Sequence, residues 1–227
     1  MLSQPDNFSC IKSYVLRTGH FTDAQQRSYN LYANEFIVPF ANDILDFRNI
    51  FGNNNPVIAE IGFGMGKATA AIAEEQREYN YLGIEVHKPG IGRLLWEINQ
   101  RTLLNVRIIE YDAVKVFSAM IPASSLEGVH IFFPDPWPKK RHHKRRLVQR
   151  PFTNAIAEKL KQGGYLLAVT DWDDYADCML SELCATDGLI NVYDGFAPPQ
   201  TWRPNTGFEE KGLGKKHIIR EILFRRK

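Results

Sequence analysis

The sequence predicts an α/β fold in which a mostly parallel sheet is covered by helices on both faces. From Pro56 onward, short apolar stretches alternate with segments of helical length, which is the pattern of βαβ units. A glycine-rich turn directly follows the first apolar stretch, and such turns let a backbone approach a bound ligand closely. No second domain is evident, and 227 residues suffice for one large hydrophobic core.

Strands and helices can be placed by their apolar and helical patterns. We expect strands at Val57–Ile61, Tyr81–Val86, Val106–Glu110, Val129–Phe133, Tyr165–Thr170 and, at the end of the chain, His217–Phe224. We expect the intervening helices at Ala68–Glu78, Ile91–Arg101, Ala113–Met120, Leu147–Leu160 and Asp174–Ala185, with Gly163-Gly164 ending the fourth of them.

Residues 1–50 show little periodicity, and we expect them to form an arm and cover outside the sheet. Segment Ile11–Gly19 is expected to be extended, with Thr22 capping a following helix and a further short helix around Asn42–Phe47. The run Gly52–Pro56 then breaks the chain before the first strand. Residues 51–227 are expected to form the ligand-binding domain of a molecule that is a single globular unit overall.

Composition and cysteine usage are those of a globular protein from a reducing compartment. Hydrophobic residues make up 44% and charged residues 24% of the chain, and the formal net charge is only +2. Cys10, Cys178 and Cys184 are scattered without a metal-ligand spacing, so neither a disulfide framework nor a zinc site is expected. Because the sequence shows no signal pattern and no membrane span, we expect a cytoplasmic protein without membrane contacts.

One stretch, Gly128–Arg146 (GVHIFFPDPWPKKRHHKRR), begins as a buried strand and ends as a block of positive charge. Between the two, prolines surround Asp135, so the loop that presents this acid is stiff. Six Lys or Arg and two His occupy the eight positions of Lys139–Arg146. A solvated surface is the alternative for any charge run, but this density favours a polyanion as partner.

The glycine turn Glu60–Lys67 (EIGFGMGK) fits two common phosphate-binding motifs poorly. A P-loop needs glycine where Ile61 stands and a hydroxyl where Ala68 stands. A dinucleotide turn needs a small third residue where Lys67 stands, because helix and strand pack closely there. The same mismatch disfavours a nicotinamide oxidoreductase, and a tight turn without any ligand stays open as an alternative.

The third pattern, an acid followed by alternating glycines, resembles the first motif of class I S-adenosylmethionine (SAM)-dependent methyltransferases. SAM contains no pyrophosphate, so phosphate ligands are unnecessary at such a turn. By this resemblance Gly62, Gly64 and Gly66 border the cofactor, and Glu60 faces its cationic amino-acid end.

Five successive predicted strands carry an acid at or just beyond their carboxyl ends. The five acids are Glu60, Glu85, Asp112, Asp135 and Asp171. Ligands of open α/β sheets bind at that edge, where an acid such as Glu85 accepts hydrogen bonds from a ribose diol. Asp112 is placed to accept from an adenine amino group. Any single acid, Asp171 especially, could instead cap a helix, but five in series favour a binding site.

Together these features resemble the tRNA (guanine-N7)-methyltransferases of the bacterial TrmB type. The motifs that carry the resemblance are EIGFGMG (Glu60–Gly66), GIEVH (Gly83–His87), FFPDPWPKKRHHKRR (Phe132–Arg146), TDW (Thr170–Trp172) and RPNTGFE (Arg203–Glu209). The length of the third motif makes the match specific. The resemblance implies a Rossmann-like class I methyltransferase fold with a mostly parallel seven-stranded sheet and helices on both faces. It also implies SAM as methyl donor, S-adenosyl-L-homocysteine as product, no metal, and a guanine of the tRNA variable loop (position 46) as target.

The resemblance further assigns roles residue by residue. Glu60, Glu85, Asp112 and Asp135 contact SAM or border its methyl group, together with the turn glycines. The substrate is bound by Lys139, Asp171, Thr206, Gly207, Phe208 and Glu209. The RNA is bound by Arg141, His142, His143, Lys144, Arg145 and Arg146. The implied enzyme acts on tRNA without an obligate protein partner, as a monomer or a homodimer.

The chain departs from the family pattern in its C-terminal region. Gly207 stands where the family has the lysine of its T-K-F-E motif, and the tail after Glu209 is also atypical. Lys211, Lys215 or Lys216 is a candidate to supply the missing charge.

The chemistry implied by the resemblance needs no proton acceptor. Guanine N7 has a free lone pair and carries no proton. Methyl transfer to N7 therefore requires placement and electrostatic support rather than a general base. We expect Asp135 to give that support, Trp137 to pack on a base or to anchor the loop, and Asp171 to accept from the guanine edge.

Two rival functions fit the sequence less well. Exocyclic-amine methyltransferases carry an acid or Asn followed by Pro-Pro-aromatic, whereas the order here is Asp135-Pro136-Trp137-Pro138. A nonenzymatic RNA-binding protein would not need an acid at the end of every strand.

Overall fold

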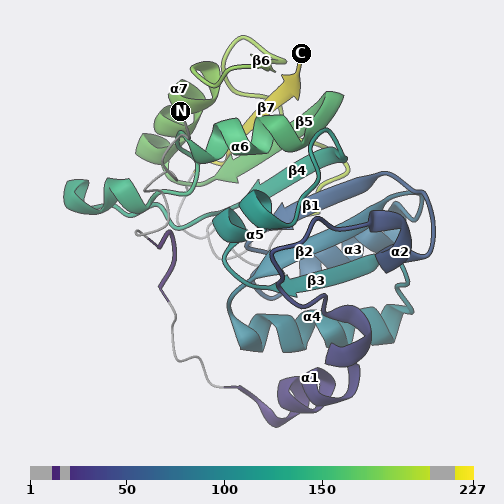
Figure 1. Cartoon of the computed structure of the whole chain (residues 1–227). Coiled ribbons are helices and arrows are strands. Elements are labelled where there is room, and N and C mark those ends of the chain that lie inside the picture. Colours follow the sequence, from purple (N-terminus) through teal and green to yellow (C-terminus); the bar gives the residue numbers. More distant parts are fainter. Residues whose placement is uncertain (1–11, 16–20, 205–217) are drawn as a thin grey trace.

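The computed structural model describes residues 12–15, 21–204 and 218–227, which form a seven-stranded sheet with helices on both faces (Figure 1). The strands are β1 (Val57–Ile61), β2 (Asn80–Glu85), β3 (Val106–Glu110), β4 (Leu126–Phe132), β5 (Leu160–Thr170), β6 (Leu189–Asn191) and β7 (Arg220–Arg226). The helices are α1 (Asp23–Phe36), α2 (Phe47–Phe51), α3 (Lys67–Glu75), α4 (Lys88–Arg101), α5 (Ala113–Ala119), α6 (Phe152–Lys159), α7 (Asp173–Cys184) and the 3-10 helix η2 (Lys140–Arg145). This architecture confirms the predicted α/β fold.

The strands follow each other across the sheet in the order β3-β2-β1-β4-β5-β7-β6. β1 pairs in parallel with both β2 and β4, β2 with β3, and β4 with β5, whereas β7 is antiparallel to β5 and to β6. From β1 the chain builds one side of the sheet through β2 and β3, and then crosses to the other side at β4. The boundary between β1 and β4 is therefore the topological switch point, where ligands bind in open α/β sheets.

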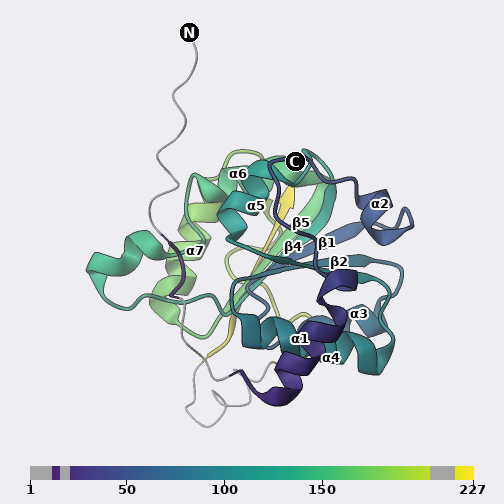
Figure 2. The same ribbon diagram turned by 60° about the horizontal axis from the view of Figure 1, so that its bottom comes forward.

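Apolar layers fill the space between the sheet and the helices on each face. On one face, α3 and α4 contribute buried residues such as Ile72 and Leu94. On the other face, α5 and α7 contribute residues such as Phe117 and Met179, with α6 beside them. Figure 2 shows α1 lying against α4, so that the first face carries an additional outer helix.

The N-terminal helix begins at its predicted cap. Thr22 forms a capping box with Gln25, and α1 then packs on α4 at Gly92, where a Cβ would lie 2.6 Å from the Gln25 carbonyl oxygen. The short helix predicted around Asn42–Phe47 is wrong in position, because α2 spans Phe47–Phe51. Asp46 caps its start and Gly52 ends it in the left-handed conformation, at φ +72°. Of the segment predicted as extended, the structure describes residues 12–15, which form neither helix nor strand.

The predicted helix Leu147–Leu160 is too long, because α6 begins only at Phe152 and β5 follows it directly. Gly163-Gly164 lies inside β5 and does not end the helix. The pairing of β5 with β4 shifts register at this point. Gly163 has φ +76°, and a Cβ on Gly164 would lie 2.9 Å from the Lys161 carbonyl oxygen. The two glycines thus permit an irregularity within a strand.

The C-terminal elements also differ in part from expectation. β7 begins at Arg220 instead of His217, and β6 has no counterpart among the expected strands. Three residues at a sheet edge leave too little pattern to be placed from sequence. Within the three described ranges, no helix is long and apolar enough to cross a membrane.

Candidate active site

The strand order brings the predicted acids to one edge of the sheet in a fixed sequence. Across β3, β2, β1, β4 and β5, they follow each other as Asp112, Glu85, Glu60, Asp135 and Asp171. These five strands run in parallel, so their carboxyl ends lie at the same edge (Figure 1). Glu60 and Asp135 flank the switch point between β1 and β4, where a ligand is expected.

The glycine turn after β1 adopts a backbone conformation that side chains disfavour. Gly62, Gly64 and Gly66 have φ values of +75°, +56° and +69°. A Cβ on Gly66 would lie 2.6 Å from Leu94 Cβ, and a Cβ on Gly90 would lie 2.0 Å from the Gly64 carbonyl oxygen. Both close approaches involve α4, so the turn is held against the first turns of this helix with its backbone at the switch point.

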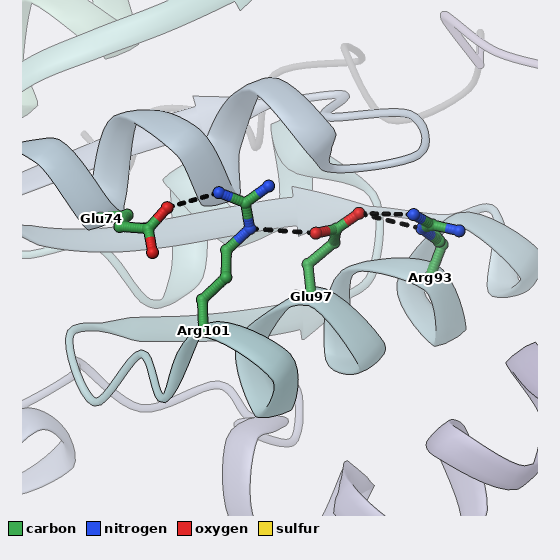
Figure 3. A network of polar contacts seen from close by, with 4 residues as sticks. All are labelled: Glu74, Arg93, Glu97 and Arg101. Atoms are coloured by element: carbon green, nitrogen blue, oxygen red, sulfur yellow. Dashed lines mark hydrogen bonds and ion pairs between the residues drawn. The ribbon is translucent and has the colours of Figure 1, made fainter.

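The two helices that flank the turn are joined by charged side chains (Figure 3). Glu97 of α4 accepts hydrogen bonds from Arg93 at 2.6 Å and from Arg101 at 3.0 Å, and Arg101 reaches Glu74 of α3 at 2.5 Å. Burial alone would raise the pKa of the Glu97 carboxyl, but the hydrogen bonds from the two arginines outweigh it and lower this pKa. The network fixes α3 and α4 relative to each other.

Glu85 connects the end of β2 to the glycine turn. One carboxylate oxygen accepts from the Gly64 backbone N–H at 2.9 Å. The other accepts from the backbone N–H groups of Val86 and His87, at 2.7 and 3.0 Å. An ionised carboxylate offers about four acceptor positions, so Glu85 can still accept a further donor such as a ribose hydroxyl.

Glu60 is a buried acid with unused hydrogen-bonding capacity. It is 3% exposed, and its Oε2 finds no hydrogen-bond partner among the described residues, nor does the neighbouring Thr69 hydroxyl. Burial raises the pKa of the Glu60 carboxyl to about 7; the neighbouring Thr69 side chain opposes this shift, and the charge of Glu85 adds to it. A buried carboxylate oxygen without a partner at the switch point fits a cationic ligand group, such as the amino group of SAM.

Asp112 serves as the N-cap of α5. Its Oδ1 accepts from the backbone N–H groups of Val114 and Lys115, at 2.9 and 3.2 Å. Tyr14 of the N-terminal segment lies beside it, and burial together with the Asp112 carboxylate raises the pKa of the Tyr14 hydroxyl. Asp112 thus caps a helix, as any single acid after a strand can do. The cap uses one of its two carboxylate oxygens, Oδ1.

The loop that presents Asp135 has an unfavourable backbone that its surroundings stabilise. Phe133 and Trp137 have φ of +50° and +48°, in a region that bulky residues avoid. The Trp137 indole N–H donates to the Ser13 carbonyl oxygen at 3.2 Å, and Arg145 lies over its ring at 4.9 Å. These contacts favour the anchoring role of Trp137 over base stacking. Asp135 itself is exposed at the edge of the sheet.

The basic segment Lys139–Arg146 extends away from the body of the molecule between β4 and α6 (Figures 1 and 2). Lys139, Arg141 and Lys144 are exposed, and His142, His143 and Arg145 are partly exposed. Arg146 is different, because it is 3% exposed and pairs with Asp174 of α7. This burial disfavours its predicted role as an RNA contact.

The predicted substrate residues are only partly covered by the structure. Asp171 follows β5 directly and is partly exposed, with Trp172 next to it at 36% exposure. Lys139 immediately precedes η2. The predictions for Thr206, Gly207, Phe208 and Glu209 fall outside the described residues, as do those for Lys211, Lys215 and Lys216.

Sequence reasoning missed a buried ion pair beside this edge. Arg203 donates to Glu221 of β7 at 2.7 Å, and their side chains are 5% and 2% exposed. The adjacent Trp202 stacks on His130 of β4, with ring centroids 5.1 Å apart. Burial lowers the pKa of His130 to about 3, so the ring is neutral. Glu221, an acid directly before the apolar run Ile222–Phe224 of β7, was the signal that could have indicated the pair.

Metal ligands and disulfides are not evident in what the structure describes. The described residues contain no group of three or more His, Cys, Asp or Glu side chains that could hold a metal ion. Cys178 and Cys184 are free thiols.

Solved structures of methyltransferases share this fold. The 16S rRNA methyltransferase KamB matches with a TM-score of 0.61 at 12% sequence identity, over 82% of this chain and 95% of that protein. The antibiotic-resistance methyltransferase Kmr matches with a TM-score of 0.55 at 12% identity, over 83% and 94%. The sheet, with β7 antiparallel beside β5, is that of the class I SAM-dependent methyltransferases.

Sequence comparison then identifies the family. A family described as "Putative methyltransferase" matches residues 54–222. The tRNA (guanine-N(7)-)-methyltransferases of Paracidovorax citrulli (strain AAC00-1) and Dechloromonas aromatica (strain RCB) are 50% and 46% identical to this chain. These matches cover 95% and 98% of this chain, and 87% and 90% of those proteins. The chain therefore belongs to the tRNA (guanine-N7)-methyltransferase family.

Proposed function

We propose that this protein transfers the methyl group of SAM to N7 of a guanine in tRNA, at position 46 of the variable loop. The observation that carries the proposal is the pairing of two features at one switch point. The buried Glu60 has an oxygen without a partner there, and the stiff Asp135 loop leads directly into a basic segment. The two features suit a cationic cofactor and a polyanionic substrate, respectively.

The cofactor would lie along the row of acids from β4 to β3. Glu60 would hold the amino group, Glu85 the ribose hydroxyls, and Asp112 the adenine amino group through the oxygen that does not cap α5. The glycines of the turn would allow the backbone to approach the cofactor closely. When bound, SAM supplies a methyl group on a positively charged sulfur.

Asp135 would act through its charge and its position. As the methyl group moves, positive charge leaves the sulfur and develops on the purine, and a fixed carboxylate nearby stabilises both states of that charge. The loop around Asp135 restricts its movement, so little reorganisation is needed at the moment of reaction. No residue has to remove a proton from N7.

Substrate recognition would use the far side of the same edge. Asp171 would accept hydrogen bonds from the N1–H and amino group of guanine and so exclude adenine, with Lys139 and Thr206, Gly207, Phe208 and Glu209 completing the contacts. The cations of Arg141, Lys144 and Arg145, with His142 and His143, would hold the RNA backbone. We place the reaction in the cytoplasm, with the enzyme acting as a monomer or a homodimer and without an obligate protein partner.

The proposal is tested by incubating the protein with labelled SAM and tRNA, and by mapping the modified nucleotide. Label at N7 of guanine 46 is expected, and label on any other base atom would contradict the assignment.

The role of Asp135 is tested with Asp135→Ala, which should abolish methylation while tRNA still binds. Asp187→Ala is a matched control, since this exposed acid follows α7 at the opposite edge of the sheet. Near-normal turnover of Asp135→Ala would refute the role.

A further inference from the structure

The last cation of the basic segment turns inward instead of facing solvent. The Arg146 Nε donates to the Pro136 carbonyl oxygen at 3.0 Å, and its Nη2 pairs with the Asp174 carboxylate. The same Nη2 lies 3.2 Å from His143 Nε2. The guanidinium covers the ring of Tyr175, with 4.8 Å between its central carbon and the ring centroid. One buried side chain thus contacts four residues.

These contacts reach different parts of the candidate site. Pro136 directly follows Asp135 in the loop after β4. Asp174 lies in the first turn of α7, three residues after Asp171. Arg146 therefore connects the loop that presents one functional acid to the helix that begins beside the other.

The surroundings of Arg146 make this connection rigid. The Tyr175 ring is fully buried, and its hydroxyl accepts from the Val148 backbone N–H at 3.1 Å, so the surface on which the guanidinium stacks is itself fixed. Pairing with Arg146 lowers the pKa of Asp174, so the acid stays ionised at neutral pH. Only arginine offers a planar set of donors that can stack on the Tyr175 ring and at the same time reach the Pro136 carbonyl oxygen and the Asp174 carboxylate.

We propose that Arg146 is a positioning residue, which holds the Asp135 loop against the start of α7 so that Asp135 and Asp171 keep the separation that methyl transfer requires. The inference rests on the function proposed for this site. The loop needs such support because Phe133 and Trp137 have positive φ, a conformation that persists only where the surroundings enforce it.

The test uses Arg146→Lys and Arg146→Ala in the full-length protein. We measure kcat and KM for tRNA methylation, tRNA affinity as a function of salt, and the thermal unfolding midpoint. Because a small displacement of a reacting group costs up to about 100-fold in rate, kcat should fall about 10- to 100-fold. The tRNA affinity and its salt dependence should stay within about twofold. Arg146→Lys keeps the charge and the fold but should lose kcat, since lysine cannot make both contacts.

Two matched variants separate positioning from charge and from stability. Arg150→Ala removes another arginine–carboxylate pair to α7, the 3.1 Å contact with Glu182, and should leave kcat unchanged. Arg145→Ala should weaken tRNA binding and reduce its salt dependence, two effects that Arg146→Ala should not show. Combining Arg146→Ala with Asp174→Ala should lower kcat no further than Arg146→Ala alone, because the two residues act together.

The outcomes distinguish this inference from the proposed function. Wild-type kcat in folded Arg146→Lys, or a loss of tRNA affinity with kcat intact, would overturn the positioning role. If the wild-type protein does not methylate tRNA guanine, the proposed function fails, and hydrogen exchange then tests the connection alone. The backbone N–H groups of Asp135 and Trp137 should exchange faster in Arg146→Lys, and unchanged exchange would overturn the inference.

Discussion

At Glu60, a proton and the cofactor group that we propose to bind there would compete for the same oxygen atoms. The carboxyl is buried and has a pKa of about 7, so at neutral pH both protonation states are populated. A cationic amino group beside it would favour the ionised state. Binding of a cation and loss of a proton are therefore coupled at this residue.

Binding of SAM should consequently tighten as the pH rises toward the pKa of Glu60. Below this pKa, which is about 7, the carboxyl must release a proton before it can face the cofactor. The apparent Kd should therefore increase about tenfold for each pH unit of acidification, and it should level off above the pKa. Calorimetry in buffers of different ionisation enthalpy measures both the affinity and the proton release.

Glu60→Gln is the control for this pH dependence. The variant should bind SAM weakly and without proton release. If it showed the same pH profile as the wild type, another group would be responsible.

Single residues also show where sequence reasoning ends. The residue types at the strand ends predicted an acidic edge, because five acids in series favour a binding site although any one of them could cap a helix. The direction of each side chain could not be predicted. Arg146 is buried because its partner Asp174, 28 residues away in sequence, lies beside it in the fold. The high local density of cations contains no information about that contact.

At the scale of elements, the glycine turn depends on a second glycine in the helix opposite it. A Cβ on Gly90 would lie 2.0 Å from the Gly64 carbonyl oxygen. Gly90→Ala must therefore displace the turn or α4, at a cost of about 1–3 kcal/mol that is partly offset by the higher helix propensity of alanine. SAM affinity should fall about tenfold or more if the turn borders the cofactor as proposed.

Gly92→Ala provides a matched control in the same helix. Its Cβ would meet the Gln25 carbonyl oxygen of α1 and not the turn. This variant should lower stability while SAM affinity is retained, and equal losses of SAM affinity in both variants would show that the effect is not specific to the turn.

The basic segment around η2 should determine the salt dependence of tRNA binding. Replacing Arg141, Lys144 and Arg145 together by alanine should weaken binding and reduce the slope of log K against log salt by about 2 to 3, because each cation releases about one counterion. Filter binding over a range of salt concentrations measures this slope.

Lys159 and Lys161 serve as the control pair. Lys159 ends α6 and Lys161 lies at the start of β5, at the opposite edge of the sheet. Their replacement by alanine should leave the slope unchanged, and an equal effect there would indicate nonspecific charge.

At the scale of the whole molecule, the buried pair of Arg203 and Glu221 joins the last strand to the chain that precedes residues 205–217. Arg203→Ala would leave Glu221 charged and buried, which should cost about 3–5 kcal/mol in the free energy of unfolding. Arg101→Ala, which removes the more exposed contacts to Glu74 and Glu97, should cost less. Urea denaturation measures the free energy of unfolding of the two variants. Similar losses of this free energy would show that the buried pair does not stabilise the fold more than the exposed contacts do.

Much of the overall architecture could be predicted, because alternating strands and helices of regular length leave few other folds. The predicted bounds of helices and strands were wrong where tertiary contacts override the local sequence pattern. Gly163-Gly164 reads as a helix end, yet it permits a register shift within β5 that depends on the pairing with β4. The domain division at residue 50 remains a prediction, and so do the roles of the site residues, which depend on ligands that local pattern does not describe.

The antiparallel direction of β7 has a consequence for how substrate recognition can change. β7 begins with Arg220, which is opposite Thr170 at the end of β5 and pairs with Asp173 at 3.5 Å. Arg203, before the same connection, is bonded to the next residue of β7, Glu221. The described chain is thus anchored on both sides of this connection, by Arg203 before it and by Arg220 after it. Because doubling the length of a flexible connection costs only about 0.6 kcal/mol, the connection between these two anchors can change in length at little cost to the fold.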